Sequence, residues 1–191
     1  MNPAPWQLES NRLILRRLRP DDAATIHSYR ALPQVAAYQS WESFELQDAQ
    51  DMLKEQAGLK PHASGTWLQL GMTLCPTGAL VGDCGIHFLQ HEPQQVELGI
   101  TLSPDHQGRG LAREALALVL GYVFDTLGKH RAIATVDERN EPAVRLFRSL
   151  GFRQEAHLIE NAWFKGAWSS ELGFAILKRE WTAAASNPAT R

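Results

Sequence analysis

The chain has 191 residues, of which 44% are hydrophobic and 21% are charged, and its formal net charge is −2 at pH 7. This length fits one domain with a core of its own, and the average composition excludes collagen-like, coiled-coil and disordered chains. The near-neutral charge gives no reason to expect a nucleic acid or a membrane surface as a partner, so we predict neither.

The two ends and the cysteines predict a cytoplasmic protein. The first residues, MNPAPWQLES, lack the basic start and apolar stretch of a signal peptide, and the longest apolar run, residues 115–124, is shorter than the ~20 residues that span a bilayer. Cys75 and Cys84 are too few for a disulfide framework. We expect a single domain over residues 1–181 and a disordered tail over residues 182–191, where apolar periodicity is absent.

The first half of the chain is predicted to form one strand, two helices and three further strands. Alternating leucines indicate a strand over residues 12–18, and Pro20 with the two aspartates after it begins a helix that Pro33 ends. A second helix covers residues 46–58. The three strands that follow are joined by connections short enough for antiparallel hairpins, and they cover residues 66–74, 79–89 and 94–102.

The second half alternates helices and strands. A helix over residues 111–127 is apolar on most sides, which predicts that it is largely buried. After a strand at residues 130–136, a short helix has Asn140 as its N-cap and Gly151 just past its end. Two final strands lie near residues 152–160 and 168–177. The order β-α-α-β-β-β-α-β-α-β-β predicts an α+β fold with a mixed, mostly antiparallel sheet and helices on both faces.

A loop with two glycines carries the first functional signal, within LGITLSPDHQGRGLA at residues 98–112. Gly108 and Gly110 allow consecutive backbone N–H groups to point one way, and the next helix adds its unsatisfied N–H groups and positive dipole end. Such a turn is an anion site, although two glycines can equally serve only the strand-to-helix turn. No Lys-Ser/Thr follows, which excludes a Walker P-loop, and Arg113 replaces the third glycine of a dinucleotide fingerprint.

Three motifs together resemble the GNAT superfamily of N-acetyltransferases. The run QGRGLA at residues 107–112, after the strand ELGITL, is similar to the acyl-CoA-binding loop of that family. NEPAVRLFRSLGF at residues 140–152 resembles its later helix. LESNRLILRRLRPDD at residues 8–22 resembles the opening of the Rim-type branch, which includes enzymes that acetylate the N-termini of ribosomal proteins. The resemblance covers nearly all of residues 8–181.

The resemblance implies acetyl-CoA as cosubstrate. The loop backbone would bind the CoA diphosphate, and the edge of the preceding strand would pair with pantetheine. The two central parallel strands would separate so that the thioester lies in the gap, where a backbone N–H at residues 100–102 would hold the developing oxyanion. Asn140 matches an asparagine that binds the pantetheine arm, and it also fits a plain helix cap. The implied cofactor-binding residues are Ile100, Leu102, Gln107, Gly108, Arg109, Gly110, Leu111, Ala112 and Asn140.

The proton-transfer groups are less clear from the sequence. Relatives carry a tyrosine or a serine where this chain has Phe147 and Ala143, so the general acid is unassigned. Glu97 is the candidate general base, with a solvent-facing structural glutamate as the alternative. His87 on the neighbouring strand is a second candidate base. His87 and His91 lack a third ligand, so no metal is predicted.

For the other candidate reactive and recognition residues, packing in the core or a place on the solvated surface is an alternative to a functional role. Cys75 and Cys84 have no evident base partner and are interpreted as packed thiols rather than acyl carriers. In the family two regions border the acceptor, and here they carry aromatic residues that could line a groove or serve the core: Tyr38, Trp41, Phe44, Trp163, Phe164 and Trp168. Acidic residues that could attract a cationic amine, or form only a solvated surface, are Asp48, Asp51, Glu55 and Glu160.

We therefore interpret the chain as an acetyl-CoA-dependent N-acetyltransferase that acetylates a primary amine by direct attack. An α-amine of a peptide, protein or amino acid is favoured, because its pKa near 7.7–8.0 leaves roughly ten per cent neutral at pH 7, far more than a lysine amine. The alternatives are a polyamine or antibiotic acetyltransferase, a non-catalytic CoA-binding regulatory protein, and a nucleotide-binding protein. Dimers are common among the relatives, which leaves a homodimer open.

Overall fold

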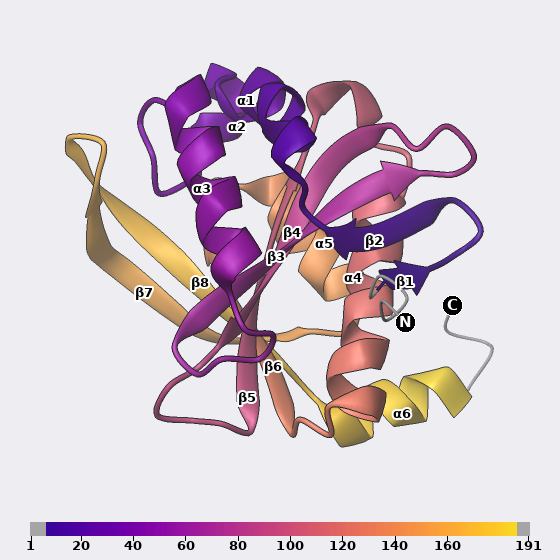
Figure 1. The fold of residues 1–191 in the computed structure, drawn as a ribbon. Helices are drawn as coiled ribbons and strands as arrows, with labels where there is room; N and C mark the ends of the chain where they lie inside the picture. Colours follow the sequence, from indigo (N-terminus) through magenta and orange to yellow (C-terminus); the bar gives the residue numbers. More distant parts are fainter. Residues whose placement is uncertain (1–6, 187–191) are drawn as a thin grey trace.

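The computed structural model describes residues 7–186, and these residues contain one eight-stranded sheet in the order β1-β2-β3-β4-β5-β6-β8-β7 (Figure 1). Neighbouring strands are antiparallel except for β5 and β6, which are parallel. The predicted mixed, mostly antiparallel sheet is confirmed. The strands are β1 (Gln7–Glu9), β2 (Leu13–Arg17), β3 (Thr66–Leu74), β4 (Leu80–Phe88), β5 (Gln95–Leu102), β6 (Arg131–Asp137), β7 (Arg153–Phe164) and β8 (Ala167–Leu177).

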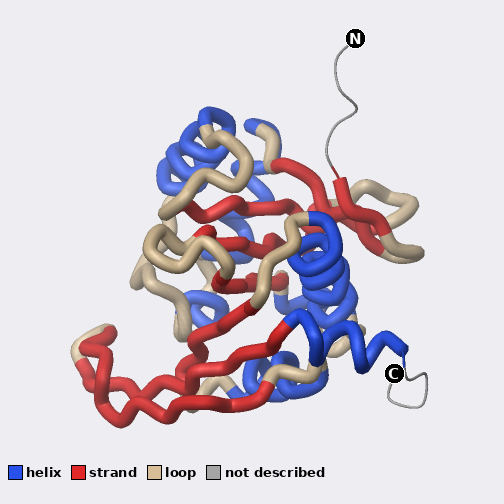
Figure 2. Tube along the Cα trace, turned by 90° about the horizontal axis from the view of Figure 1, so that it is seen from below, coloured by secondary structure: helices blue, strands red, loops and turns tan. Residues whose placement is uncertain are grey.

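Helices cover both faces of this sheet, as Figures 1 and 2 show. One face carries α1 (Ala23–Arg30), α2 (Pro33–Ala36) and α3 (Leu46–Gly58). The other face carries α4 (Leu111–Gly121) and α5 (Glu141–Ser149), and α6 (Lys178–Ser186) follows the last strand. The largest core cluster lies under α4 and α5, where side chains such as Leu116, Leu120 and Phe147 meet the sheet. The prediction of a buried helix from residue 111 is confirmed.

The two central strands separate part-way along their length. Parallel pairing of β5 with β6 is restricted to three pairs, Gln95↔Arg131, Val96↔Ala132 and Glu97↔Ile133. Beyond these pairs β5 continues to pair with β4, and β6 with β8, but β5 and β6 no longer pair with each other. Thr135, in the middle of β6, is exposed as a result. The sheet therefore has the internal gap that the family resemblance implies.

Three local differences from the sequence analysis have simple causes. Pro33 does not only end α1, because its fixed φ also suits the first position of the short helix α2. The helix that begins at Leu111 changes at Tyr122 to a π-helical turn that ends at Thr126. The predicted disordered tail is wrong for residues 182–186, which continue α6, where several alanines favour helix. Residues 187–191 of that tail lie outside the described part of the chain.

Candidate active site

A cleft of about 500 Å³ opens where β5 and β6 separate, between the N-terminal ends of α4 and α5. We call it the β5–α4 cleft. It brings together all of the cofactor-binding residues expected from the sequence except Arg109. Its lining residues are Gln34, Val35, Tyr38, Gln39, Ile100, Thr101, Leu102, Gln107, Gly108, Gly110, Leu111, Ala112, Arg113, Asn140, Pro142, Ala143, Arg145 and Leu146.

The glycines of the loop are required by its backbone. Gly108 has φ 72° and Gly110 has φ 76°, in the left-handed region where side chains cause strain. Gly110 is also the N-cap of α4, and it offers no side chain to bond the free N–H groups of the first helical turn. These N–H groups and the positive end of the helix dipole therefore remain available to an anion in the cleft.

Arg12 holds this loop from outside the cleft. From the turn between β1 and β2, its Nη1 donates to the carbonyl oxygen of Arg109 at 3.0 Å, and its Nε donates to Oε2 of Glu114 at 2.7 Å. Ser10 Oγ donates to the other oxygen of Glu114 at 2.6 Å. Burial raises the pKa of Glu114, but the hydrogen bonds from Ser10 and Arg12 outweigh it, so the pKa is lowered overall. The loop and the first turn of α4 are thus fixed by one ionic clamp.

At the second helix N-terminus, Asn140 caps α5, since its Oδ1 accepts the N–H of Ala143 at 3.2 Å. Asn140 and Ala143 both line the β5–α4 cleft. Phe147 instead packs in the core, with ring centroids 5.2 Å from Phe152 and 6.2 Å from Phe174. The two positions at which relatives carry a tyrosine or serine therefore offer no proton donor.

The candidate base lies on the opposite face of the sheet. Val96 and Leu98 point into the core under α4, so Glu97 between them points toward the face of α1–α3. Glu97 pairs in register with His87 of β4, and His87 pairs with Trp67 of β3. His87 Nδ1 lies 3.4 Å from Glu97 Oε2, and the His87 and Trp67 rings stack at 4.8 Å and 13°. The structure thus joins both candidate bases in one cross-strand row, the Trp67–His87–Glu97 row.

Two functional candidates, Arg12 and Trp67, were missed by reasoning from the sequence. Arg12 lies nearly 100 residues from its loop partner, and no local pattern links them. Trp67 had an indirect signal in Gly85 and Gly99, because a glycine inside a strand often marks the close approach of another group. A Cβ at Gly85 would lie 2.8 Å from Cε3 of Trp67.

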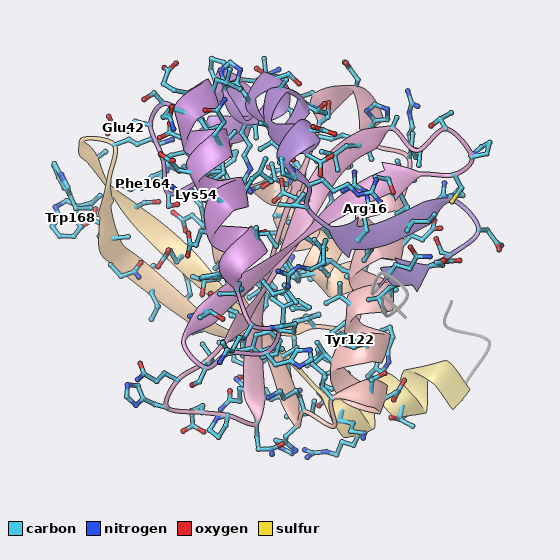
Figure 3. All side chains as sticks on the ribbon, viewed as in Figure 1. Arg16, Glu42, Lys54, Tyr122, Phe164 and Trp168 are labelled. Carbon is cyan, nitrogen blue, oxygen red and sulfur yellow. The ribbon has the colours of Figure 1, made fainter. Side chains whose placement is uncertain are left out.

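The aromatic candidates divide between core and surface. Trp41 and Phe44 pack on the buried guanidinium of Arg30, at 4.6 and 5.3 Å, so they belong to the α1–α3 layer. Tyr38 lines the β5–α4 cleft. Trp163 and Trp168 stay exposed on the β7–β8 hairpin, and Figure 3 shows Trp168 pointing outward there, beyond Phe164.

Among the acidic and thiol candidates, Asp48 and Asp51 form hydrogen bonds within or beside α3, and Cys84 is buried in the core. Asp48, the third residue of α3, accepts a hydrogen bond from the N–H of the N-cap residue Glu45 at 2.7 Å and completes a capping box, and Asp51 accepts one from Gln47. Burial, together with the nearby Asp83 carboxylate, raises the pKa of the Cys84 thiol and keeps it protonated. Within residues 7–186 no group of three or more His, Cys, Asp or Glu side chains is placed to hold a metal ion. No helix of this part of the chain has the length and apolar character to cross a membrane.

Comparison with known proteins identifies the family. Residues 12–153 match the profile of the Acetyltransferase (GNAT) domain. The chain belongs to this family and is an acetyl-CoA-dependent N-acetyltransferase.

Similar proteins agree with this class without fixing the acceptor. N-acetyltransferase p20 of Bacillus licheniformis, itself described as uncharacterized, is 30% identical over 91% of this chain and 97% of its own. A GNAT-family acetyltransferase structure from Bacillus anthracis has a TM-score of 0.83 at 26% identity, covering 92% and 100% of the two chains. Spermidine N-acetyltransferase from Vibrio cholerae, solved with CoA and spermine, has a TM-score of 0.78 at 23% identity, covering 91% and 99%. The expected Rim-type branch is therefore not distinguished from other branches.

Proposed function

We propose that this enzyme acetylates the α-amino group of a peptide, protein or amino acid. The observation that carries this choice is the charge on the α1–α3 face around the gap. Asp83 of β4 is neutralised by Arg30, with 2.5 Å between Oδ1 and Nη2, and Asp137 of β6 is neutralised by Arg139 at 2.7 Å. On β4, β5 and β6, as the structure describes them, Glu97 is the carboxylate of this face that has no arginine or lysine partner.

The acidic residues that are paired in this way are firmly held. The hydrogen bond from Arg139, which is the largest influence, and a further one from Ser169 lower the pKa of Asp137 to about 2 despite partial burial. Tyr29 also donates to Asp83, at 2.5 Å between the hydroxyl and Oδ2. A polyamine carries several positive charges and needs several free carboxylates, whereas an α-ammonium group needs one. On these three strands, Glu97 is thus the single carboxylate left to meet a cation at the gap, which supports an acceptor with one positive charge there. Within the part of the chain that the structure describes, further carboxylates of this side without an arginine or lysine partner lie on α3 and β8.

In the proposed complex, acetyl-CoA occupies the β5–α4 cleft. The N–H groups of residues 107–112 and the α4 N-terminus hold the diphosphate, with Arg113 and Arg145 adding positive charge at the cleft wall. Pantetheine runs beside Ile100 and Leu102 and reaches Asn140 from the other side of the gap. The thioester then lies between β5 and β6, accessible from the face of Glu97.

The proposed reaction is direct transfer. The ammonium group first loses one proton, the neutral nitrogen attacks the thioester carbonyl carbon, and a backbone N–H of residues 100–102 stabilises the oxyanion. As the tetrahedral intermediate collapses, the C–S bond breaks and the nitrogen's second proton passes to the leaving sulfur. The products are the amide and the free CoA thiol.

Glu97 takes the first proton through water in this scheme. A strand rises about 3.3 Å per residue, so Ile100 lies roughly 10 Å along β5 from Glu97, beyond the reach of a carboxylate. Phe147 and Ala143 supply no acid, which requires the CoA thiolate to leave without a protein donor. The similar fold of a spermidine acetyltransferase supports a second candidate function, acetylation of a polyamine.

Acceptor competition tests the proposal. CoA-thiol release is measured with trialanine, with an Nα-blocked lysine peptide and with spermidine at equal concentration and pH 7. We expect the highest kcat/KM for trialanine. A preference for spermidine or for the lysine side chain would contradict the proposed acceptor, and acetyl-CoA binding without thiol release in any of the three assays would show that none of these amines is the acceptor.

A further inference from the structure

Trp67 occupies an unusual position for a large aromatic side chain. It lies on β3, inside the sheet and beside α3, yet it remains 36% exposed. The main-chain carbonyl oxygen of Trp67 accepts a hydrogen bond of 2.9 Å from Nε2 of Gln56 on α3, and this bond fixes the backbone below the indole. Packing into the core does not account for this residue, because part of the ring still faces solvent on the α1–α3 side.

Two glycines keep the neighbouring strands clear for the indole. A Cβ at Gly85 of β4 would lie 2.8 Å from Cε3 of Trp67, and one at Gly99 of β5 would lie 3.5 Å from Cζ3. The ring therefore extends from β3 across β4 to β5. Gly99 is two residues beyond Glu97, the last residue of β5 that pairs with β6. The edge of the indole thus reaches the rim of the gap in which the thioester is proposed to lie.

The other members of the row are accessible and lack a permanent cationic partner. The His87 and Glu97 side chains are each 24% exposed, and their contact of 3.4 Å is long for a hydrogen bond. His87 lies between the indole and the carboxylate, stacked on one and directed at the other. This order lets His87 hold the side chain of Glu97 in place beside the indole.

An unsatisfied polar atom lies beside the row. Gln69 is two residues from Trp67 on the same face, and its Oε1 is buried without a hydrogen-bond partner among the residues that the structure describes. Its Nε2 lies 3.0 Å from where a Cβ of Gly85 would be. A buried acceptor atom without a donor costs free energy unless a ligand or water supplies one. An ammonium group is such a donor, and it reaches this oxygen when the Gln69 side chain turns outward.

We propose that the Trp67–His87–Glu97 row, with Gln69, is the receiving site for the amino group of the acceptor. This inference rests on the proposed function and adds the residues that bind the amine. Glu97 attracts the ammonium group through the water that takes its proton, and the exposed indole contacts the positive charge and the adjacent carbon atoms, as aromatic rings do for organic cations. His87 is a positioning residue that holds Glu97 and the indole in place.

The test separates amine binding from cosubstrate binding. We expect Trp67→Leu to raise the KM for trialanine roughly five-fold, as for a lost cation–π contact, and Trp67→Phe to raise it less. The kcat should change less than two-fold, and the acetyl-CoA affinity measured by calorimetry should stay unchanged. The matched control is Trp181→Leu, which changes a tryptophan of α6 outside both the row and the β5–α4 cleft and should leave both parameters unchanged.

The role of His87 has its own pair of variants. His87→Leu should raise the KM for trialanine and lower kcat, whereas His87→Gln, which keeps an N–H donor toward Glu97, should restore most of both. Unchanged KM in Trp67→Leu, or equal effects on trialanine and acetyl-CoA in both Trp67 variants, would overturn the receiving site. If the wild type prefers spermidine, the proposed acceptor fails, and the same variants assayed with spermidine still decide whether the row receives the amine.

Discussion

The two faces of the gap between β5 and β6 are built from different parts of the chain. On the side of α4 and α5, the site consists mainly of backbone: left-handed glycines, helix N-termini and the unpaired edge of β5. On the side of α1–α3, it consists of side chains that meet across three strands, Trp67, His87 and Glu97. A site built from backbone groups depends on few side chains beyond its glycines and the residues that hold the loop, whereas the specificity of a site built from side chains depends on each of them.

The largest effect should come from breaking the backbone face. Gly108→Val should abolish acetyl-CoA binding, a loss of more than about 100-fold, because a β-branched residue strains the left-handed conformation and blocks close approach of a phosphate. Calorimetry measures this loss. The matched control is Gly78→Val, since Gly78 also has φ 72° but lies in the β3–β4 turn, outside the cleft. Normal acetyl-CoA affinity in Gly108→Val would refute the loop assignment.

On the side-chain face, Glu97→Gln should lower kcat by about 100-fold near pH 7, the low end for loss of a general base. The loss should shrink above pH 8, where an α-amine is already neutral without help. A pH–rate profile of variant and wild type checks this expectation. A drop of equal size at every pH would show that Glu97 only positions the amine, and unchanged kinetics would remove it from the mechanism.

The smallest of the three effects should come from a change that weakens the glycine loop from outside the cleft. Arg12→Ala removes the bond to the Arg109 carbonyl and should raise the KM for acetyl-CoA about ten-fold, on the order of 1.4 kcal/mol, with kcat and the acceptor KM unchanged. Glu114→Gln should weaken the same clamp, so that the double variant shows less than the sum of both effects. Additive effects, or a change in acceptor KM, would contradict a clamp specific to the loop.

The difference between the faces also explains what the sequence could predict. The bounds of α3 and β3 coincide with those expected, since both have clear periodicity and turn signals at their ends. The glycine loop and the cap at Asn140 follow from local chemistry at fixed spacing. The stacking of His87 on Trp67 depends on strand register, which joins residues 20 positions apart and leaves no local trace.

Long-range polar contacts were equally hidden from the sequence. Trp41 could serve a groove or the core until the fold placed it over Arg30, whose partner Asp83 lies on β4. Arg12 belongs to the motif that suggested the family, but its contact with the Arg109 carbonyl appears only in three dimensions. The absence of periodicity after Trp181 predicts a tail, whereas α6 continues to Ser186 through a run of alanines, which favour helix.

The restriction of β5–β6 pairing to three residue pairs gives the sheet an edge in its interior. Unpaired strand edges usually invite other chains to add to the sheet and aggregate, and proteins shorten, charge or cover them. Here the start of α4 and the start of α5 line the space beside this edge, together with Tyr38. The edge that would be an aggregation hazard in an open sheet thereby lies inside a cleft, between two helices.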